Sequence, residues 1–278
     1  MSTLYNPRGF ISPWLRYGAK HFYRIIFDSE YRFLQFLSGR IGRRARYQPG
    51  VFQFKGLPVH YVDAASLLSA WDEIFVNRIY DIGEARDPYF VDCGANVGLA
   101  ELYWKCRYPN FSSVCFEPDP EIFQVLAGNL RAWQCATVPR EEAVGAKEGM
   151  ANFLAEGGDA GKLAQVAAVN AKGRPVRVTT LSPHLDRPVD LLKIDIEGAE
   201  LAVLEECRAS LHNVKRVFVE THSFRNRDQD FMDVMAILKE SGFRCYLEVA
   251  VGGKAFFQRG SAGAGDIDLG LNVYGVRV

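Results

Sequence analysis

The chain has 278 residues, 48% of them hydrophobic, and carries 33 basic and 33 acidic residues. A chain of this length and composition can bury the core of one large domain without help from disulfides or a structural metal. Its six cysteines form no CxxC pair and no cluster with zinc-ligand spacing, which argues against both. No run of about 18 apolar residues occurs, and Arg16, Lys20 and Arg24 interrupt the N-terminal apolar stretch, so we expect a cytoplasmic protein that could touch a membrane surface.

Charge divides the chain unequally. Residues 1–50 hold nine basic and two acidic residues, a net of +7, while residues 51–278 hold 24 basic and 31 acidic residues, a net of −7. Pro13 after Ser12 predicts the start of a helix, and a second, aromatic helix is expected over residues 31–37. We therefore predict a basic aromatic helical arm over residues 1–50 and a separate domain over residues 51–278.

The sequence leaves three hypotheses for this arm. It can pack its apolar stripe on the domain, or on a second subunit in a homo-oligomer. Residues 12–46 can instead lie on an anionic membrane surface, because they mix aromatic side chains with arginine. The arm could also hold a phosphate-bearing acceptor. Nucleic acid is not expected as a partner, because the domain is acidic and no RNA-binding signature accompanies the arm.

The domain begins with a hairpin and continues with alternating strands and helices. The stretch "VFQFKGLPVHYV" predicts a hairpin that turns at Lys55–Pro58, and a helix near Ala65–Tyr80 follows. The alternation from residue 90 onward predicts an α/β fold with a doubly wound, mostly parallel seven-stranded sheet of the Rossmann-like type. Its strands are expected at 90–94, 113–117, 137–144, 190–196, 215–221, 243–250 and 271–278. Helices are expected at 98–107, 119–133, 199–211 and 228–241, with an extra strand pair at 151–155 and 175–181.

The stretch "FVDCGANVGL" forms the first strand-to-helix turn of this sheet, where such folds bind ligands. Gly94 is expected to let the backbone turn sharply and approach a ligand, and Gly98 to let the next helix pack on the strand. Asn96 stands where a dinucleotide-binding turn has its second glycine. Asp92 suits a cationic ligand better than a pyrophosphate, which favours S-adenosylmethionine over NAD. We assign all four residues to the cofactor site.

Two later strand ends complete the expected cofactor site. Glu117 ends the second strand, 19 residues after the last glycine of the turn, where an acid can bond both ribose hydroxyls of an adenosine. Asp119 is expected to cap the following helix. Ala143 and Val144 in "EEAVG" could lie beside the adenine, or could belong to the strand core.

Charged residues in "DLLKIDIEG" and "VFVETH" indicate a catalytic site. Alternation places Lys193, Asp195 and Glu197 on one face of a strand that is normally apolar on both faces. Glu220 and His222 share a face at the end of the adjacent strand. We predict Asp195, Glu220 and His222 as catalytic residues, with His222 as the general base by its ordinary pKa. Asp195 would contact the methionine ammonium or the acceptor hydroxyl, or form an ion pair with Lys193.

Other roles remain open at the same strand ends. Glu197 and Glu200 open a helix, where acids are favoured by the helix dipole and can act as caps. Asp195 and Glu220 could share a divalent cation such as Mg²⁺. The acceptor pocket is expected to be shaped by two loops, residues 156–174 and 252–270.

Five segments carry a family resemblance: "VDCGANVGLAELY", "CFEPDPEIFQVLAGNL", "EEAVG", "DLLKIDIEGAELAVLEE" and "VFVETHSF". They fall in order between residues 90 and 224, and through them the chain resembles the FkbM-type S-adenosylmethionine-dependent methyltransferases. The resemblance implies a class I methyltransferase fold and O-methylation of a hydroxyl on a sugar, glycan or polyketide-type product.

The sequence also favours one kind of acceptor atom over another. The strand expected at 190–196 lacks the [DN]-P-P-[YF] motif of methyltransferases that act on amino groups, so oxygen is favoured. Two alternatives remain: a nucleotide-cofactor oxidoreductase of the NAD type on the same architecture, and a non-catalytic adenosine-binding module.

Overall fold

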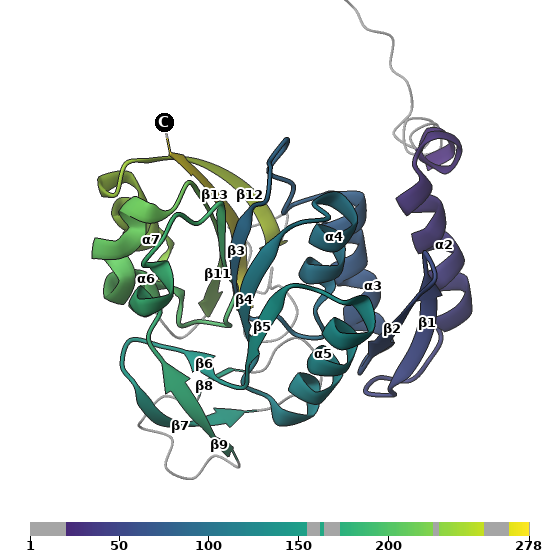
Figure 1. Ribbon diagram of the computed structural model, residues 1–278, viewed down its shortest axis with the longest axis horizontal. Coiled ribbons are helices and arrows are strands. Elements are labelled where there is room, and N and C mark those ends of the chain that lie inside the picture. Colours follow the sequence, from purple (N-terminus) through teal and green to yellow (C-terminus); the bar gives the residue numbers. More distant parts are fainter. Residues whose placement is uncertain (1–20, 155–161, 164–172, 225–227, 253–266, 278) are drawn as a thin grey trace, which may run out of the picture.

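The computed structural model describes residues 21–154, 162–163, 173–224, 228–252 and 267–277. A central seven-stranded sheet has helices on both faces (Figure 1). Its strand order is β12-β13-β11-β10-β3-β4-β5, and β13 is the strand that runs antiparallel to both of its neighbours. The strands are β3 (Tyr89–Cys93), β4 (Ser112–Phe116), β5 (Thr137–Arg140), β10 (Leu191–Ile194), β11 (Arg216–Phe224), β12 (Phe243–Gly252) and β13 (Ile267–Arg277). The predicted doubly wound, mostly parallel sheet is confirmed.

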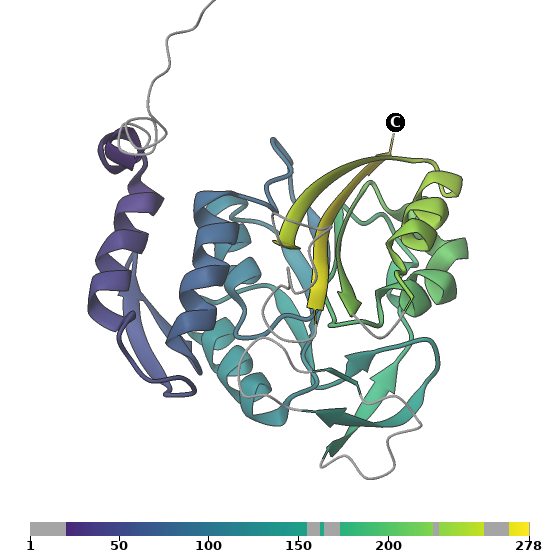
Figure 2. The same cartoon turned by 180° about the vertical axis from the view of Figure 1, so that it is seen from behind.

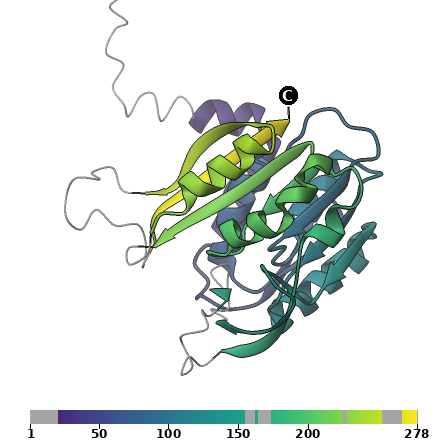
Figure 3. The same ribbon diagram turned by 90° about the vertical axis from the view of Figure 1, so that its left-hand side faces the viewer.

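Both faces of the sheet are buried, because alternate strand residues point to different helices. Phe90 of β3 packs in a core with α4 (Leu99–Arg107) and α5 (Pro120–Trp133). Its neighbour Val91 packs in the opposite core, with α6 (Glu200–Cys207) and α7 (Phe231–Glu240). Asp92 therefore falls on the α4 side of the sheet, like Phe90. Figure 3 shows α6 and α7 covering the strands on the other side.

The chain also forms a smaller sheet, and the structure differs from two of the predicted element boundaries. The strand predicted over 137–144 is two strands, because β5 is followed by a separate β6 (Ala143–Val144). The sheet has the order β6-β9-β7-β8, in which β7 (Gly149–Leu154) and β9 (Arg174–Thr179) are the predicted extra pair and β8 (Lys162–Leu163) is a short addition. A 3₁₀ turn, η2 (Ser182–Leu185), leads to β10, and the helix predicted over 199–211 ends as α6 and continues as a second 3₁₀ segment, η3 (Arg208–Asn213).

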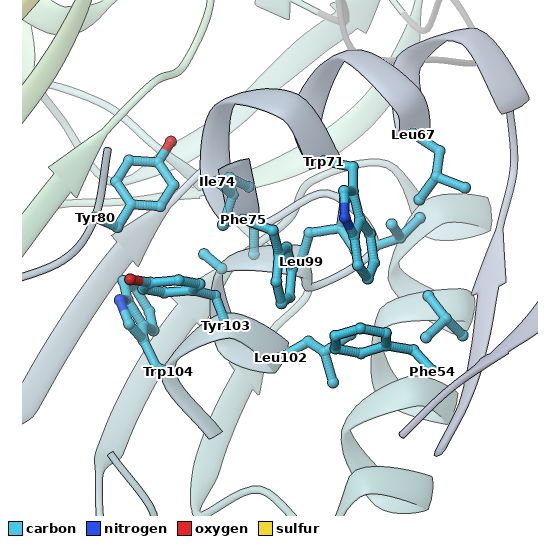
Figure 4. Packing of buried hydrophobic residues seen from close by; sticks show 14 of the residues in the cluster. Phe54, Leu67, Trp71, Ile74, Phe75, Tyr80, Leu99, Leu102, Tyr103 and Trp104 are labelled. Atoms are coloured by element: carbon cyan, nitrogen blue, oxygen red, sulfur yellow. The ribbon is translucent and has the colours of Figure 1, made fainter. Parts of the chain in front are cut away.

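The predicted hairpin pairs β1 (Gly50–Phe54) with β2 (Leu57–Tyr61). Its turn is tighter than expected, because Lys55 and Gly56 both have positive φ angles (50° and 81°) and suffice to reverse the chain. The following helix α3 (Ala64–Trp71) changes to a π-helix, η1 (Asp72–Val76), instead of continuing to residue 80. Trp71 and Phe75 stack there with ring centroids 4.1 Å apart and fill the space beside Phe54 (Figure 4).

The arm lies outside this aromatic layer. Residues 21–27 are helical, and α2 (Ser29–Ile41) starts at Asp28, whose carboxylate accepts the backbone N–H groups of Glu30 and Tyr31. Leu34, Leu37 and Ile41 are buried in the same core as the hairpin. In Figures 1 and 2, α2 is the outermost described helix at this edge. The hypothesis that the arm packs on the domain thus holds for α2, whereas the helix start predicted at Ser12 lies outside the described residues.

The two loops predicted to shape the acceptor pocket, residues 156–174 and 252–270, lie largely outside the described residues. Within the part of the chain that the structure describes, no helix combines the length and apolar character needed to cross a membrane.

Candidate active site

The turn after β3 is held against both neighbouring strands. The backbone N–H groups of Gly94 and Ala95 donate to the Phe116 carbonyl at 3.1 and 2.9 Å, and the N–H of Asp195 donates to the Cys93 carbonyl at 3.1 Å. Gly94 has a φ of +92°, and a Cβ there would lie 1.9 Å from the Asp195 carbonyl oxygen. The absence of a side chain is thus required by the close approach of β10.

Gly98 has a different reason from the one predicted. Its φ is +90°, and a Cβ would lie 2.9 Å from Leu126 Cδ1 and 3.3 Å from the Trp133 ring. Both neighbours belong to α5. The absence of a side chain at Gly98 therefore allows α4 to begin close to α5, whereas we had predicted that it allows α4 to pack on the strand. Asn96 also has a positive φ, +50°, which asparagine tolerates better than most residues.

Glu117 is buried at the end of β4 and holds the turn through its carboxylate. One oxygen accepts the Asn96 N–H at 2.9 Å, and the other accepts the Asp119 N–H at 2.9 Å. Asp119 caps α5 as predicted, by accepting the N–H groups of Glu121 and Ile122. Burial raises the pKa of Glu117 to about 7, against the lowering effect of the two amide bonds. Each carboxylate oxygen can accept a further hydrogen bond, which is the capacity that a ribose diol requires.

Asp92 forms an ion pair inside the protein. Its Oδ1 lies 2.9 Å from Lys193 Nζ, and both side chains are almost completely buried. The same ammonium donates to the Gly94 carbonyl at 2.8 Å and lies 3.6 Å from Asp195 Oδ2. Lys193 thus ties the carboxylates of β3 and β10 to the backbone of the glycine turn. This geometry indicates that Asp92 shapes the cofactor turn from beneath, while its direct contact with the cofactor stays a prediction.

Glu101 belongs to the same buried group and was not predicted. It is fully buried on α4, and burial together with the charge of Asp92 raises its pKa well above the usual range. This shift favours the protonated form of Glu101 beside the Asp92 carboxylate. The sequence did contain a signal that Glu101 is buried. It stands among apolar residues in "GLAELYW", and the helical periodicity of this stretch does not place it on a polar face.

The three predicted catalytic residues come together just after β10 and in the second half of β11. Single ligand atoms of Asp195, Glu220 and His222 all lie within 4.8 Å of one another. His222 Nδ1 lies 3.1 Å from Glu200 Oε1, and its Nε2 lies 3.6 Å from Glu197 and 3.7 Å from Glu220. The His222 side chain is 4% exposed, whereas that of Glu220 is 16% exposed and that of Asp195 is 27% exposed. The two carboxylates are therefore more exposed than the imidazole.

Protonation follows from this arrangement. Burial alone would lower the pKa of His222, but the hydrogen bond with Glu200 and the charges of the neighbouring carboxylates raise it to about 10. Burial and the charge of Asp195 raise the pKa of Glu220 to about 8, although His222 opposes that shift. At neutral pH the histidine is thus an imidazolium, and Glu220 is the group that exchanges a proton near the working pH.

Glu200 organises the loop between β10 and α6. Its Oε1 accepts the N–H of Gly198 at 3.0 Å and that of Ile196 at 3.3 Å, in addition to the contact with His222. These contacts lie in the loop before α6 and not at the N–H groups of its first turn, so Glu200 supports this loop and His222 instead of capping the helix as predicted.

Ala143 and Val144 are both buried in β6, which pairs with β9. Ala143 packs with Phe153 and Val176, and Val144 packs in the core that contains α6. These contacts explain the two residues as strand core, and a contact with adenine stays a prediction.

The donor set fits S-adenosylmethionine. Beyond Glu117, the carboxylates of Asp92, Asp195, Glu197 and Glu200 lie around two cations, Lys193 and His222, so the region carries excess negative charge even with Glu220 protonated. A cationic sulfonium with an ammonium group suits such a surface, and a pyrophosphate does not. When bound, this cofactor supplies an already activated methyl group.

The strand order, the glycine turn after β3 and the acid that ends β4 define a class I methyltransferase of Rossmann-like fold. The family model described as "Methyltransferase FkbM domain" matches residues 92–245, more than half of the sequence. The chain belongs to the FkbM family of S-adenosylmethionine-dependent methyltransferases, as the resemblance implied. This membership excludes the alternative of an NAD-type oxidoreductase.

Two relatives that are named as methyltransferases support this assignment. "Methyltransferase sdnD" of Sordaria araneosa is 32% identical over 220 residues, which cover 62% of this chain and 80% of that protein. "Methyltransferase 1" of Beauveria bassiana is 30% identical over 210 residues, with coverages of 63% and 80%. Among solved structures, Aeropyrum pernix fibrillarin with bound S-adenosyl-L-methionine is 12% identical, with coverages of 85% and 86% and a TM-score of 0.44. A likeness of that size bears on neither the site nor the acceptor.

Glu117→Gln tests the ribose contact. We expect the affinity for S-adenosylhomocysteine to fall about 10-fold to 100-fold, because a charged hydrogen-bond acceptor is lost. Isothermal titration calorimetry measures the change, with Glu121→Gln as the matched control because that side chain is exposed at the start of α5. Unchanged affinity in Glu117→Gln would remove this residue from the cofactor site.

Proposed function

We propose that the protein transfers the methyl group of S-adenosylmethionine to a hydroxyl oxygen of a sugar, glycan or polyketide-type natural product. The observation that supports oxygen as the acceptor atom is the partly exposed pair of Asp195, just after β10, and Glu220, within β11. An aliphatic hydroxyl must lose its proton as it attacks, and a carboxylate with a pKa near 8 can accept that proton.

The residues divide this work between them. Glu220 accepts the proton of the acceptor hydroxyl. Asp195, which is held by Lys193 at 3.6 Å, accepts a hydrogen bond and orients the acceptor or the methionine ammonium. His222 is a positioning residue, because its ring is buried and both of its nitrogens face carboxylates. The sequence-based assignment of His222 as the base is replaced here by Glu220.

A magnesium ion at Asp195 and Glu220 is not needed in this proposal. The His222 imidazolium already lies 3.7 Å from Glu220, where it supplies positive charge of the kind that a metal would contribute. We expect methyl transfer to persist after treatment with EDTA. Loss of activity on chelation, restored by Mg²⁺, would instead assign the cluster to metal-assisted deprotonation.

The acceptor class is tested with a panel of hydroxylated compounds. Purified protein is incubated with methyl-labelled S-adenosylmethionine and sugars, oligosaccharides or polyketide-type alcohols, together with the corresponding amines. We expect label in the alcohols alone, as methyl ethers detected by mass spectrometry. Transfer to amines would contradict the choice of oxygen. Binding of S-adenosylhomocysteine without turnover on any acceptor would favour the non-catalytic module.

A further inference from the structure

The outer face of the arm exposes a group of large apolar side chains. They are between 46% and 69% exposed and lie within 15 residues of one another: Phe22, Tyr23, Ile26, Phe27 and Phe36. These are five of the 14 large hydrophobic side chains that are exposed in the described part of the chain. Tyr23 and Phe27 contact each other, with ring centroids 4.8 Å apart. An exposed aromatic cluster of this density marks an interaction surface.

The opposite face of the arm is already occupied. Leu34, Leu37 and Ile41 are buried against the hairpin layer, and Phe33 packs on Trp71 with ring centroids 5.1 Å apart. In Figures 1 and 2, no other coloured element lies outside α2. The exposed aromatic side chains therefore do not take part in the core of the protein.

Exposed arginines accompany the aromatic side chains. Arg32, Phe36 and Arg40 follow one another at four-residue intervals on α2 and are all exposed, and the Arg32 guanidinium donates to the carbonyls of Ile25 and Ile26. The Arg40 guanidinium lies 5.6 Å from the centroid of the Phe36 ring, and Arg43 follows just after the helix. The two acids of the region are engaged within the protein, because Asp28 caps α2 and Glu30 lies 3.2 Å from Lys55.

The same surface is therefore both aromatic and basic. We propose that this outer face of the arm binds the anionic surface of a lipid bilayer, with the rings in the interface and the arginines against the lipid phosphates. Residues 51–278 carry a net charge of −7 and are repelled from such a surface, so the arm alone makes the contact. A two-fold interface between copies would bring the arginines of both chains together.

The strength of binding should depend on both kinds of side chain. Each basic residue near an anionic surface strengthens binding about fivefold, so we expect Arg40→Glu with Arg43→Glu to weaken it at least about 100-fold. We expect Phe22→Ser with Phe27→Ser to weaken it about tenfold or more. All four positions are exposed, and the variants should keep the wild-type melting temperature.

Vesicle flotation tests the proposal with the full chain. Wild-type protein should float with phosphatidylcholine vesicles that contain phosphatidylserine, float less at high salt, and stay unbound with phosphatidylcholine alone. Met232→Ser with Lys239→Glu is the matched control, because these residues are exposed on α7, away from the arm, and should leave flotation unchanged.

Three outcomes would overturn the proposal. The first is that no protein floats with the anionic vesicles, and the second is that the arm variants float like the wild type. The third is that analytical ultracentrifugation shows a dimer that the arm variants abolish while flotation is unaffected. That last result would assign the surface to a second copy of the chain.

Discussion

Lys193→Met will lower the free energy of unfolding by about 3–5 kcal/mol, because it leaves the Asp92 carboxylate buried without its cation. The loss should exceed that of an ordinary salt bridge, since the same ammonium also holds the Gly94 carbonyl at 2.8 Å. Urea denaturation followed by circular dichroism measures the change. Binding of S-adenosylhomocysteine should weaken in parallel, because the glycine turn loses its support.

The control for this prediction is Lys215→Met. Lys215 lies 2.8 Å from Asp190, but its side chain is 57% exposed, so its loss should cost less than about 1 kcal/mol. Asp92→Asn combined with Lys193→Met removes both charges and should recover part of the lost stability. If Lys193→Met alone stays within about 1 kcal/mol of the wild type, the buried pair does not support the turn as described.

Glu220→Gln will lower kcat about 10²-fold to 10⁴-fold, because the group that accepts the hydroxyl proton is lost. The affinity for S-adenosylhomocysteine should change little. Glu205→Gln, an exposed carboxylate on α6, is the matched control and should keep wild-type turnover. Both variants are measured with the best acceptor from the hydroxyl panel.

The pH dependence of the wild-type enzyme distinguishes Glu220 from His222. Glu220 must be ionised to accept a proton, so the rate should rise with pH through about 8. It should fall as His222 loses its proton near pH 10. A histidine base of ordinary pKa would place the rising limb near about 6.5.

His222→Gln adds a readout that a purely structural role would not change. Removing the imidazolium takes away a charge that lowers the pKa of Glu220, so the rising limb should move to higher pH. If His222 is itself the base, this variant instead loses the rising limb together with its activity.

The sequence predicted the central sheet well because parallel strands and helices alternate in a pattern that few topologies satisfy. The apolar runs fixed β3, β4 and β10 to within one or two residues. The interruption between β5 and β6 was missed, because the periodicity of "TVPREEAV" does not show that Ala143 pairs with a different sheet. The π-helix after α3 was also missed, because no local breaker such as glycine or proline marks it; Trp71 and Phe75 stack across it.

The residues of the candidate site could be predicted from the sequence, but their protonation states and chemical roles could not. Strand alternation placed Asp195, Glu220 and His222 at one edge of the sheet, and the structure brings them together. The protonation of His222 depends on Glu200, which is 22 residues away in the sequence, and no local pattern shows that contact. Likewise, the burial of Asp92 beside Glu101 depends on how α4 packs against β3.

Calorimetric titration of the folded wild-type protein with S-adenosylhomocysteine, with NAD as the comparison, tests the central claim most directly. We predict saturable binding of S-adenosylhomocysteine and no heat of binding with NAD. A folded protein that ignores S-adenosylhomocysteine at millimolar concentration, or binds NAD instead, would contradict the assignment of the turn at Gly94 and Glu117 to a methyl donor.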